Sequence, residues 1–287
     1  MNQDIYPCLW CDHNASETAE FYVQALGAKV LIHTPIVVHI EVAGQRIMLL
    51  NGGPQFEKNA SVSLMIICNS AEELNKYWDA LAIEGIALMP LDAYPFADRY
   101  GWIRDKYGMT WQLYFKEGYS PEQRITPTLM FVNENNGKAK AAMDLYTSVF
   151  PDSGIDGIMY YKDGEGGDYP DHIQHAEFRV HNYKIACMDS SLEHNFNFNE
   201  GISIVVMTND QQETDQLWEQ LTAEGGQESM CGWLKDKFGL SWQIVPKRLE
   251  ALMASQENPS GAQAAMKAML QMKKIVIADL EAAYNNA

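Results

Sequence analysis

Apolar residues along the chain fall into short strand-like runs and helical stripes, and these recur in one order: a strand, a helix and three further strands. In the first unit, the helical stripe stops at Gly27, a residue that readily takes the left-handed conformation of a helix end. The strand-like runs of this unit lie at about 5–10, 30–33, 37–42 and 46–50. We therefore expect an α+β chain built from strand–helix–three-strand units.

The same order starts again three more times. Strand-like runs at 62–68, 126–131 and 202–207 each lead into a helical stripe. Capping boxes predict two of the helix starts, Ser70 with Glu73 and Asp210 with Glu213, and Asn14 with Glu17 predicts a similar start for the first helix. The stretch 90–100 contains nine residues more than the fourth unit has at this place, and we expect it to form a loop long enough to close over a ligand.

One pattern of thirteen residues is written twice, at 101–113 and 232–244. Its two copies read GWIRDKYGMTWQL and GWLKDKFGLSWQI, and seven of the positions are identical at an offset of 131. Each copy predicts a hairpin, with Asp first and Gly fourth in a tight turn between two apolar runs. A repeat of this length indicates an internal duplication.

The duplication sets the expected domain limits. We expect a first domain at 1–118, a polar linker at 119–124 with Pro121, and a second domain at 125–247. Residues 248–287 are rich in Ala, Met, Leu and Lys, which predicts a helical tail with one long amphipathic helix at about 260–284. That helix would brace the two domains; a homodimer through the C-terminal helices is the alternative.

Composition and charge exclude several classes of protein. The net charge of −17 and the absence of a basic stripe argue against a nucleic-acid partner. No apolar stretch approaches the ~18 residues of a membrane span, and no signal-peptide pattern opens the chain, so we expect no membrane partner and a cytoplasmic location. Five irregularly spaced cysteines fit a reducing compartment; Cys8 and Cys11 form a single CxxC, and burial is favoured over a metal or redox role.

These repeated units resemble the vicinal oxygen chelate superfamily of glyoxalase, bleomycin-resistance and dioxygenase proteins, and the paired Gly-Trp…Trp-Gln hairpins resemble its PhnB-like branch, labelled 3-demethylubiquinone-9 3-methyltransferase-like. The resemblance implies two tandem domains, each of paired βαβββ units forming an incompletely closed barrel around a ligand cavity. It also implies a divalent metal held by His, Glu or Gln on the first and last strands of the units.

This chain departs from that metal pattern. The strands equivalent to the metal-binding strands carry no His or Glu at their centres, and Gln112 and Gln243 offer only amide oxygens. We therefore predict no metal site and no cofactor, although a divalent metal remains the disfavoured alternative. The methyltransferase label finds no support either, because the Gly-rich stretch at 164–167 lies in an acidic loop without the strand and helix that a nucleotide-type cofactor needs.

Two His–Glu pairs are the candidate catalytic residues. His39 with Glu41 and His175 with Glu177 each share one face of a strand, which suits a proton-transfer pair. We favour the alternative that each His is paired with another polar group or faces solvent. His172 adds a polar neighbour to the second pair only.

The candidate ligand-binding residues are two amides and three indoles: Gln112, Gln243, Trp10, Trp102 and Trp233. Within each hairpin strand, Gln112 and Gln243 face away from Trp111 and Trp242, so we expect the amides to mark the cavity and most tryptophans to lie in the core. The leading hypothesis is a small-molecule-binding protein without the superfamily metal. The alternatives are an enzyme, either metal-dependent or using the His–Glu pairs, and a scaffold whose tail engages a partner.

Overall fold

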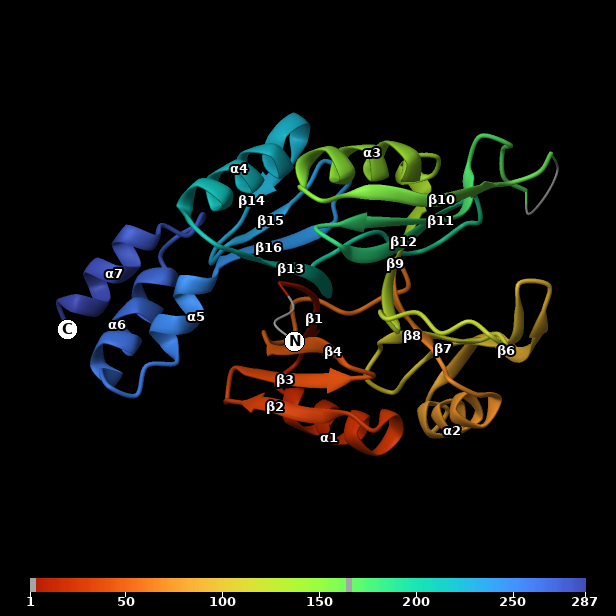
Figure 1. Ribbon diagram of the computed structural model, residues 1–287, viewed down its shortest axis with the longest axis horizontal. Helices are drawn as coiled ribbons and strands as arrows, with labels where there is room; N and C mark the ends of the chain where they lie inside the picture. The colour runs from red at the N-terminus through yellow and green to blue at the C-terminus, as the bar shows by residue number, and fades with distance from the viewer. Residues whose placement is uncertain (1–3, 164–166) are drawn as a thin grey trace. The chain divides into compact units, whose positions relative to one another are not determined.

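The computed structural model describes residues 4–163 and 167–287 (Figure 1). Residues 164–166 of the Gly-rich stretch lie outside the described part of the chain. The chain divides into two compact units: Pro7–Ile202, and Met1–Tyr6 together with Ser203–Ala287. The linker predicted at 119–124 lies inside the larger unit, between two of its strands.

Strand–helix–three-strand modules make up both units, as the sequence predicts. The larger unit holds most of the first module and all of the second and third; the smaller unit holds nearly all of the fourth. The first module is β1 (Ile5–Cys11), α1 (Ala15–Leu26), β2 (Lys29–His33), β3 (Val37–Val42) and β4 (Gln45–Asn51). The second is β5 (Val62–Ile67), α2 (Ala71–Leu81), β6 (Ile86–Tyr94), β7 (Ala97–Arg104) and β8 (Thr110–Phe115).

The third and fourth modules keep this order. The third is β9 (Ile125–Val132), a short 3-10 turn (Asn133–Asn135), α3 (Ala139–Val149), β10 (Gly154–Tyr160), β11 (Ile173–Val180) and β12 (Tyr183–Ser190). The fourth is β13 (Ile202–Thr208), α4 (Gln211–Thr222), a short 3-10 turn (Ala223–Gly225), β14 (Gln227–Glu228), β15 (Trp233–Lys235) and β16 (Ser241–Pro246). The fold class inferred from the sequence is confirmed.

Two eight-stranded sheets are formed, and one lies wholly within the larger unit. Its strand order is β10-β11-β12-β9-β5-β8-β7-β6, so the third module joins the second through the antiparallel pair β9–β5. Helix α2 packs against β7 and β8, and α3 packs against β11 and β12 (Figure 1). This sheet therefore combines a module from each side of the predicted linker.

Local signals account for most helix ends. Ser70 and Asp210 accept the N–H groups of Glu73 and Glu213, as the capping boxes predict. Helix α1 begins after Asn14 as predicted, but the Asn14 side chain makes no capping bond, and Asn51 Oδ1 accepts the N–H of Ala15 instead. A residue distant in sequence thus supplies the cap.

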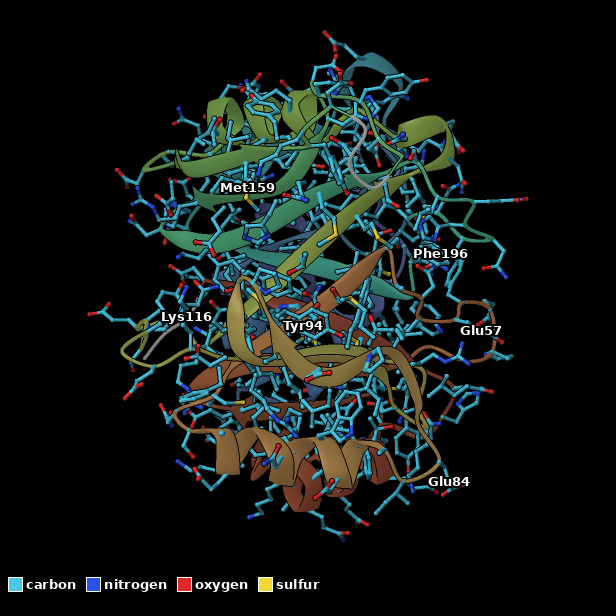
Figure 2. The ribbon with its side chains drawn as sticks, turned by 90° about the vertical axis from the view of Figure 1, so that its right-hand side faces the viewer. Glu57, Glu84, Tyr94, Lys116, Met159 and Phe196 are labelled. Carbon is cyan, nitrogen blue, oxygen red and sulfur yellow. The ribbon has the colours of Figure 1, made fainter. Side chains whose placement is uncertain are left out.

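Residues 90–100 form a hairpin and not the predicted loop. Strand β6 runs to Tyr94 and β7 begins at Ala97, so most of the extra residues extend two paired strands (Figure 2). Aromatic rings stabilise this extension, because Tyr94 stacks on Phe96 at 5.5 Å and both contact Tyr100 edge to face.

The tail folds as three helices, α5 (Lys247–Met253), α6 (Pro259–Met269) and α7 (Ile277–Asn285). Their shared core contains Leu252, Ile275 and Leu280. The predicted long helix is interrupted where the chain bonds to the fourth module. Cys231 donates its N–H to Met272 O, and Gln211 donates to Ile275 O within the break and accepts the N–H of Ile277 at the start of α7. No helix in the described part of the chain is long and apolar enough to cross a membrane.

Candidate functional site

The repeated hairpin is held by a buried aspartate at its turn. Asp105 accepts the N–H groups of Tyr107 and Met109 on one oxygen, and the Trp111 indole and the Tyr22 hydroxyl on the other. Asp236 repeats this arrangement with Trp242. Trp111 and Trp242 are fully buried, so the pattern directs the indole toward the helices and the next residue, Gln112 or Gln243, to the opposite face.

We call the helix-opposed side of the larger unit's sheet the Gln112 face; it carries Ser63, Gln112, Thr128 and Glu177. On this face Gln112 is 4% exposed and its amide has two partners. Its Nε2 donates to Ser63 Oγ at 2.7 Å, and its Oε1 accepts from the Tyr100 hydroxyl at 2.9 Å. Burial raises the pKa of Tyr100, which keeps that hydroxyl a donor. The orientation of the amide is therefore fixed.

Three polar atoms beside this amide have no hydrogen-bond partner among the described residues. They are buried: Trp102 Nε1, Thr110 Oγ1 and Thr128 Oγ1. Trp102 is the β7 partner of Gln112, Thr128 is the β9 partner of Ser63, and Thr110 precedes Gln112 by two residues on the same face. A buried polar group without a partner costs about 1–3 kcal/mol, so this cluster marks a place where a ligand would be stabilised.

The two His–Glu pairs differ in the structure. On the Gln112 face, His175 Nε2 lies 3.7 Å from Glu177 Oε1, and Lys184 Nζ lies 2.7 Å from Glu177 Oε2. The nearby His175, supported by Lys184, lowers the pKa of Glu177 to about 2. The structure thus brings His175 and Glu177 together and keeps the carboxylate ionised.

In the first module, His39 and Glu41 have separate partners. Arg46 Nε donates to His39 Nδ1 at 2.9 Å, and Lys29 lies 3.3 Å from Glu41. Burial, assisted by the Arg46 charge, lowers the pKa of His39 to about 3. A histidine that stays neutral and is bonded to a guanidinium is a poor general base, which agrees with the interpretation favoured from the sequence.

The candidate tryptophans take different places. Trp10 donates its indole N–H to Gly53 O at 2.7 Å and lies edge to face with Phe56, so it closes a turn. Trp102 is the one with an unpartnered buried nitrogen. Trp233 lies opposite Gln243 in the fourth module, as Trp102 lies opposite Gln112.

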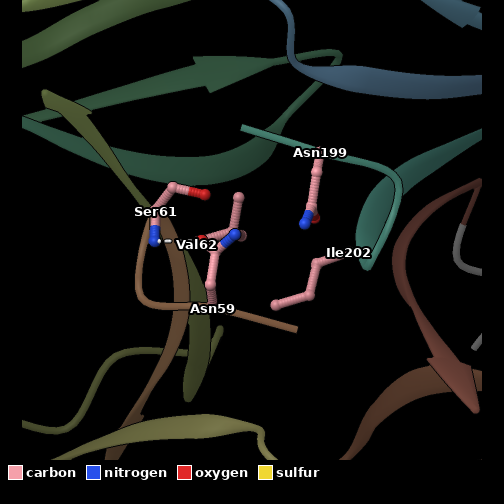
Figure 3. A pocket seen from close by; sticks show the side chains of 5 residues that line it. All are labelled: Asn59, Ser61, Val62, Asn199 and Ile202. Carbon is pink, nitrogen blue, oxygen red and sulfur yellow. Dashed lines mark hydrogen bonds between the residues drawn. The ribbon is translucent and has the colours of Figure 1, made fainter. Parts of the chain in front are cut away.

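A small pocket in the larger unit lies where two loops meet (Figure 3). It is lined by Asn59, Ser61, Val62, Asn199 and Ile202. Both asparagine side chains are used in bonds to the loops themselves, and no ionisable side chain lines the pocket. We assign the pocket a structural role.

Comparison with protein families identifies the family to which this chain is related. The family model described as 3-demethylubiquinone-9 3-methyltransferase matches residues 3–114 and again residues 123–245. The chain belongs to this family. Each match covers one half of the duplication, so the family accounts for most of the chain.

A solved structure of low sequence identity shows the same fold. Glyoxalase I from Zea mays superposes with a TM-score of 0.56 at 10% identity, covering 83% of this chain and 89% of that one. A PhnB protein from Bacillus cereus, named a putative 3-demethylubiquinone-9 3-methyltransferase, is 28% identical over 40% of this chain and all of its own length, with a TM-score of 0.37. A search of the curated proteins gave no match. The family name describes the matching model and does not assign a methyl transfer to this chain.

The divalent metal of the superfamily does not fit the residues present in this family member. The Gln112 oxygen already accepts from Tyr100, and its neighbours on the face are hydroxyls and the thioether of Met65. In the described residues, 4–163 and 167–287, no three His, Cys, Asp or Glu side chains converge as a metal site requires. His39 lies beside a guanidinium, which would repel a cation.

The cysteine pair lies in the core. Neither Cys8 nor Cys11 forms a disulfide with a described residue, both are almost completely buried, and burial raises the pKa of Cys11. Both behave as small apolar residues, as favoured from the sequence.

Sequence reasoning missed Ser63, Tyr100 and Lys184. Lys184 could have been found from the turn at His181-Asn182, because the register of that hairpin places Lys184 on the same face as Glu177. Tyr100 was assigned to a loop, and this concealed its bond to Gln112. His172, expected beside His175, instead pairs with buried Asp168 at 2.6 Å, and Asp168 also accepts the N–H of Ser191.

Proposed function

We propose that this protein binds a small polar organic molecule on the Gln112 face, through hydrogen bonds and without a metal. The observation that carries the proposal is the set of three unpartnered buried atoms, on Trp102, Thr110 and Thr128, around an amide held in one orientation. Groups that are already buried and positioned lose little freedom when a ligand binds, so their hydrogen bonds contribute directly to affinity.

The three unpartnered atoms on the Gln112 face favour a ligand with hydrogen-bond acceptors. The Trp102 indole can only donate, and each threonine hydroxyl can donate or accept. The apolar surroundings include Met65 and Met130, whose side chains adapt to ligands of different shape. A carbonyl- or ether-bearing ring compound meets these requirements, and a multiply charged ligand does not.

A thermal-shift screen of small carbonyl- and hydroxyl-bearing aromatic compounds tests the proposal. We expect compounds that raise the melting temperature of the parent protein. Their apparent affinity should fall at least about tenfold in Trp102→Phe and in Thr128→Val, because each substitution removes one hydrogen bond and little volume. Ser148→Ala, on the exposed surface of α3, is the matched control and should leave binding unchanged. Hits that bind both site variants as tightly as the parent protein would contradict the proposal.

A metal-free proton-transfer enzyme is the second candidate. The supporting observation is that His175 and Glu177 contact each other on the same face, with Lys184 fixing the carboxylate. The His175 side chain is 37% exposed and could exchange a proton with a bound molecule and with solvent. If a confirmed ligand is converted, His175→Gln should abolish turnover but not binding; unchanged turnover would exclude this role.

A further inference from the structure

The residue directly before the repeated hairpin pattern differs between its two copies. Tyr100 in the first copy corresponds to Cys231 in the second, at the same offset of 131 that relates Gln112 to Gln243. In the first copy the tyrosine hydroxyl donates to the amide oxygen. Cys231 supplies no such bond, and its own N–H is taken by Met272 O.

The side-chain amide of Gln243 therefore has a partner for its N–H group but, among the described residues, none for its oxygen. Gln243 Nε2 donates to Ser203 Oγ at 2.9 Å, which repeats the bond between Gln112 and Ser63. Gln243 Oε1 has no hydrogen-bond partner in the described part of the chain, although the residue is only 5% exposed. Ser241, two residues earlier on the same face, carries a hydroxyl oxygen that is buried and has no hydrogen-bond partner among the described residues.

We propose that the fourth module holds a separate binding site, at Gln243 and Ser241, for a small planar molecule that carries an O–H or N–H donor. The Gln243 oxygen accepts that donor, and the Ser241 hydroxyl bonds to a polar atom beside it. Trp233, the strand partner of Gln243, supplies an aromatic neighbour for the ring of the ligand.

Tyr100 is the residue that makes the two copies select different ligands. Its hydroxyl occupies the amide oxygen of Gln112, so the first copy offers a ligand mainly donors, whereas the second copy offers an acceptor. A ligand that covers the Gln243 oxygen removes it from solvent, so an analogue that lacks the donor is rejected because it leaves this oxygen unpaired. The proposed site itself consists only of residues of the smaller unit and does not depend on binding at the Gln112 face.

Phenol and anisole are matched probes for this site, since anisole replaces the phenol O–H by a methyl ether. The side-chain amide resonances of Gln112 and Gln243, assigned with Gln112→Leu and Gln243→Leu, report binding by NMR in the full-length protein. We expect phenol to shift the Gln243 resonances and leave those of Gln112 unchanged, and anisole to bind at least about tenfold more weakly. Gln243→Leu should weaken phenol binding by a similar factor.

Tyr100→Phe gives an independent test, because it removes one hydroxyl and no ring. It should free the Gln112 oxygen and add a phenol-dependent shift at Gln112 while the response at Gln243 stays the same. Equal responses to phenol and anisole would show apolar binding only and overturn the proposal. So would a parent protein in which Gln112 responds and Gln243 does not, or one in which neither responds.

Discussion

Asn59 and Asn199 occupy equivalent positions in the second and fourth repeats, and each donates its side-chain N–H to the loop that carries the other. Asn59 bonds to Asn197 O at 3.0 Å, and Asn199 bonds to Glu57 O at 2.9 Å. All four positions are related by an offset of 140. The duplication is thus visible at the level of single hydrogen bonds, and it brings two distant loops of the larger unit together.

Gly201→Ala should destabilise the protein by about 1–3 kcal/mol. A Cβ at this position would lie 2.3 Å from Glu57 O, a backbone atom that cannot move without disturbing the paired loops. Urea unfolding measures the free energy. Gly157→Ala in β10 is the matched control, because a Cβ there meets nothing within 4 Å, and it should be close to neutral. Equal effects of the two substitutions would show that loop contact is unimportant.

Asp105→Asn should cost about 3 kcal/mol of unfolding free energy. The buried carboxylate accepts four hydrogen bonds, and an amide would place a donor against one of these donors. Burial raises the pKa of Asp105, and its hydrogen bonds offset part of that effect. Thermal unfolding followed by circular dichroism is sufficient for this comparison. Asp171→Asn, an exposed aspartate, provides the baseline, and a loss no larger than that baseline would refute a structural role for Asp105.

Protonation of Glu177 should lower the free energy of unfolding below about pH 4.5. Its pKa is lowered from 4.5 to about 2 by His175 and Lys184, so the unfolded chain binds more protons between these values. The stabilisation is complete above pH 4.5 and is lost as the pH falls toward 2, an effect of about 1–3 kcal/mol. Urea unfolding between pH 3 and pH 6 should show a shallower slope for Glu177→Gln than for the exposed control Glu257→Gln. Equal slopes of unfolding free energy against pH in the two variants would show that the ion pair does not contribute to this pH dependence.

His39 should affect the free energy of unfolding over a higher pH range than Glu177. Its pKa is lowered from 6.5 to about 3 by burial and by Arg46, so the unfolded chain binds the extra proton between these values. Stability is therefore complete above pH 6.5 and falls by up to about 1.4 kcal/mol per pH unit below it. His39→Gln should remove this dependence between pH 6.5 and 4.5, measured by urea unfolding, whereas His13→Gln, which is exposed, should retain it. A dependence that survives His39→Gln would place its origin elsewhere.

Local patterns in the sequence were sufficient for the modules, the two capping boxes and the turn at Asp105. They could not show which modules share a sheet, because the pairing of Ser63 with Thr128 joins strands whose apolar patterns are alike. The extra residues at 90–100 were expected as a loop because their aromatic contacts, such as Tyr94 with Tyr100, depend on strand pairing.

The candidate site was predictable only in part. The face of Gln112 follows from its position next to Trp111, but its partner Tyr100 lies on another strand. Arg46 was not expected beside His39, although the hairpin places the two side chains on one face. Hydrogen bonds between side chains of different strands decide which polar residues stay available, and no local pattern records them.

The β9–β5 pairing has a consequence for any half-length version of this chain. A polypeptide that ended before residue 125 would lack β9, and the edge of β5 would present a row of unpaired backbone groups. Because β9 belongs to the other half of the duplication, a second copy of such a polypeptide could supply an equivalent strand. In the full chain both strands of this pair belong to one polypeptide, so their association does not depend on protein concentration, as it would for two separate half-length molecules.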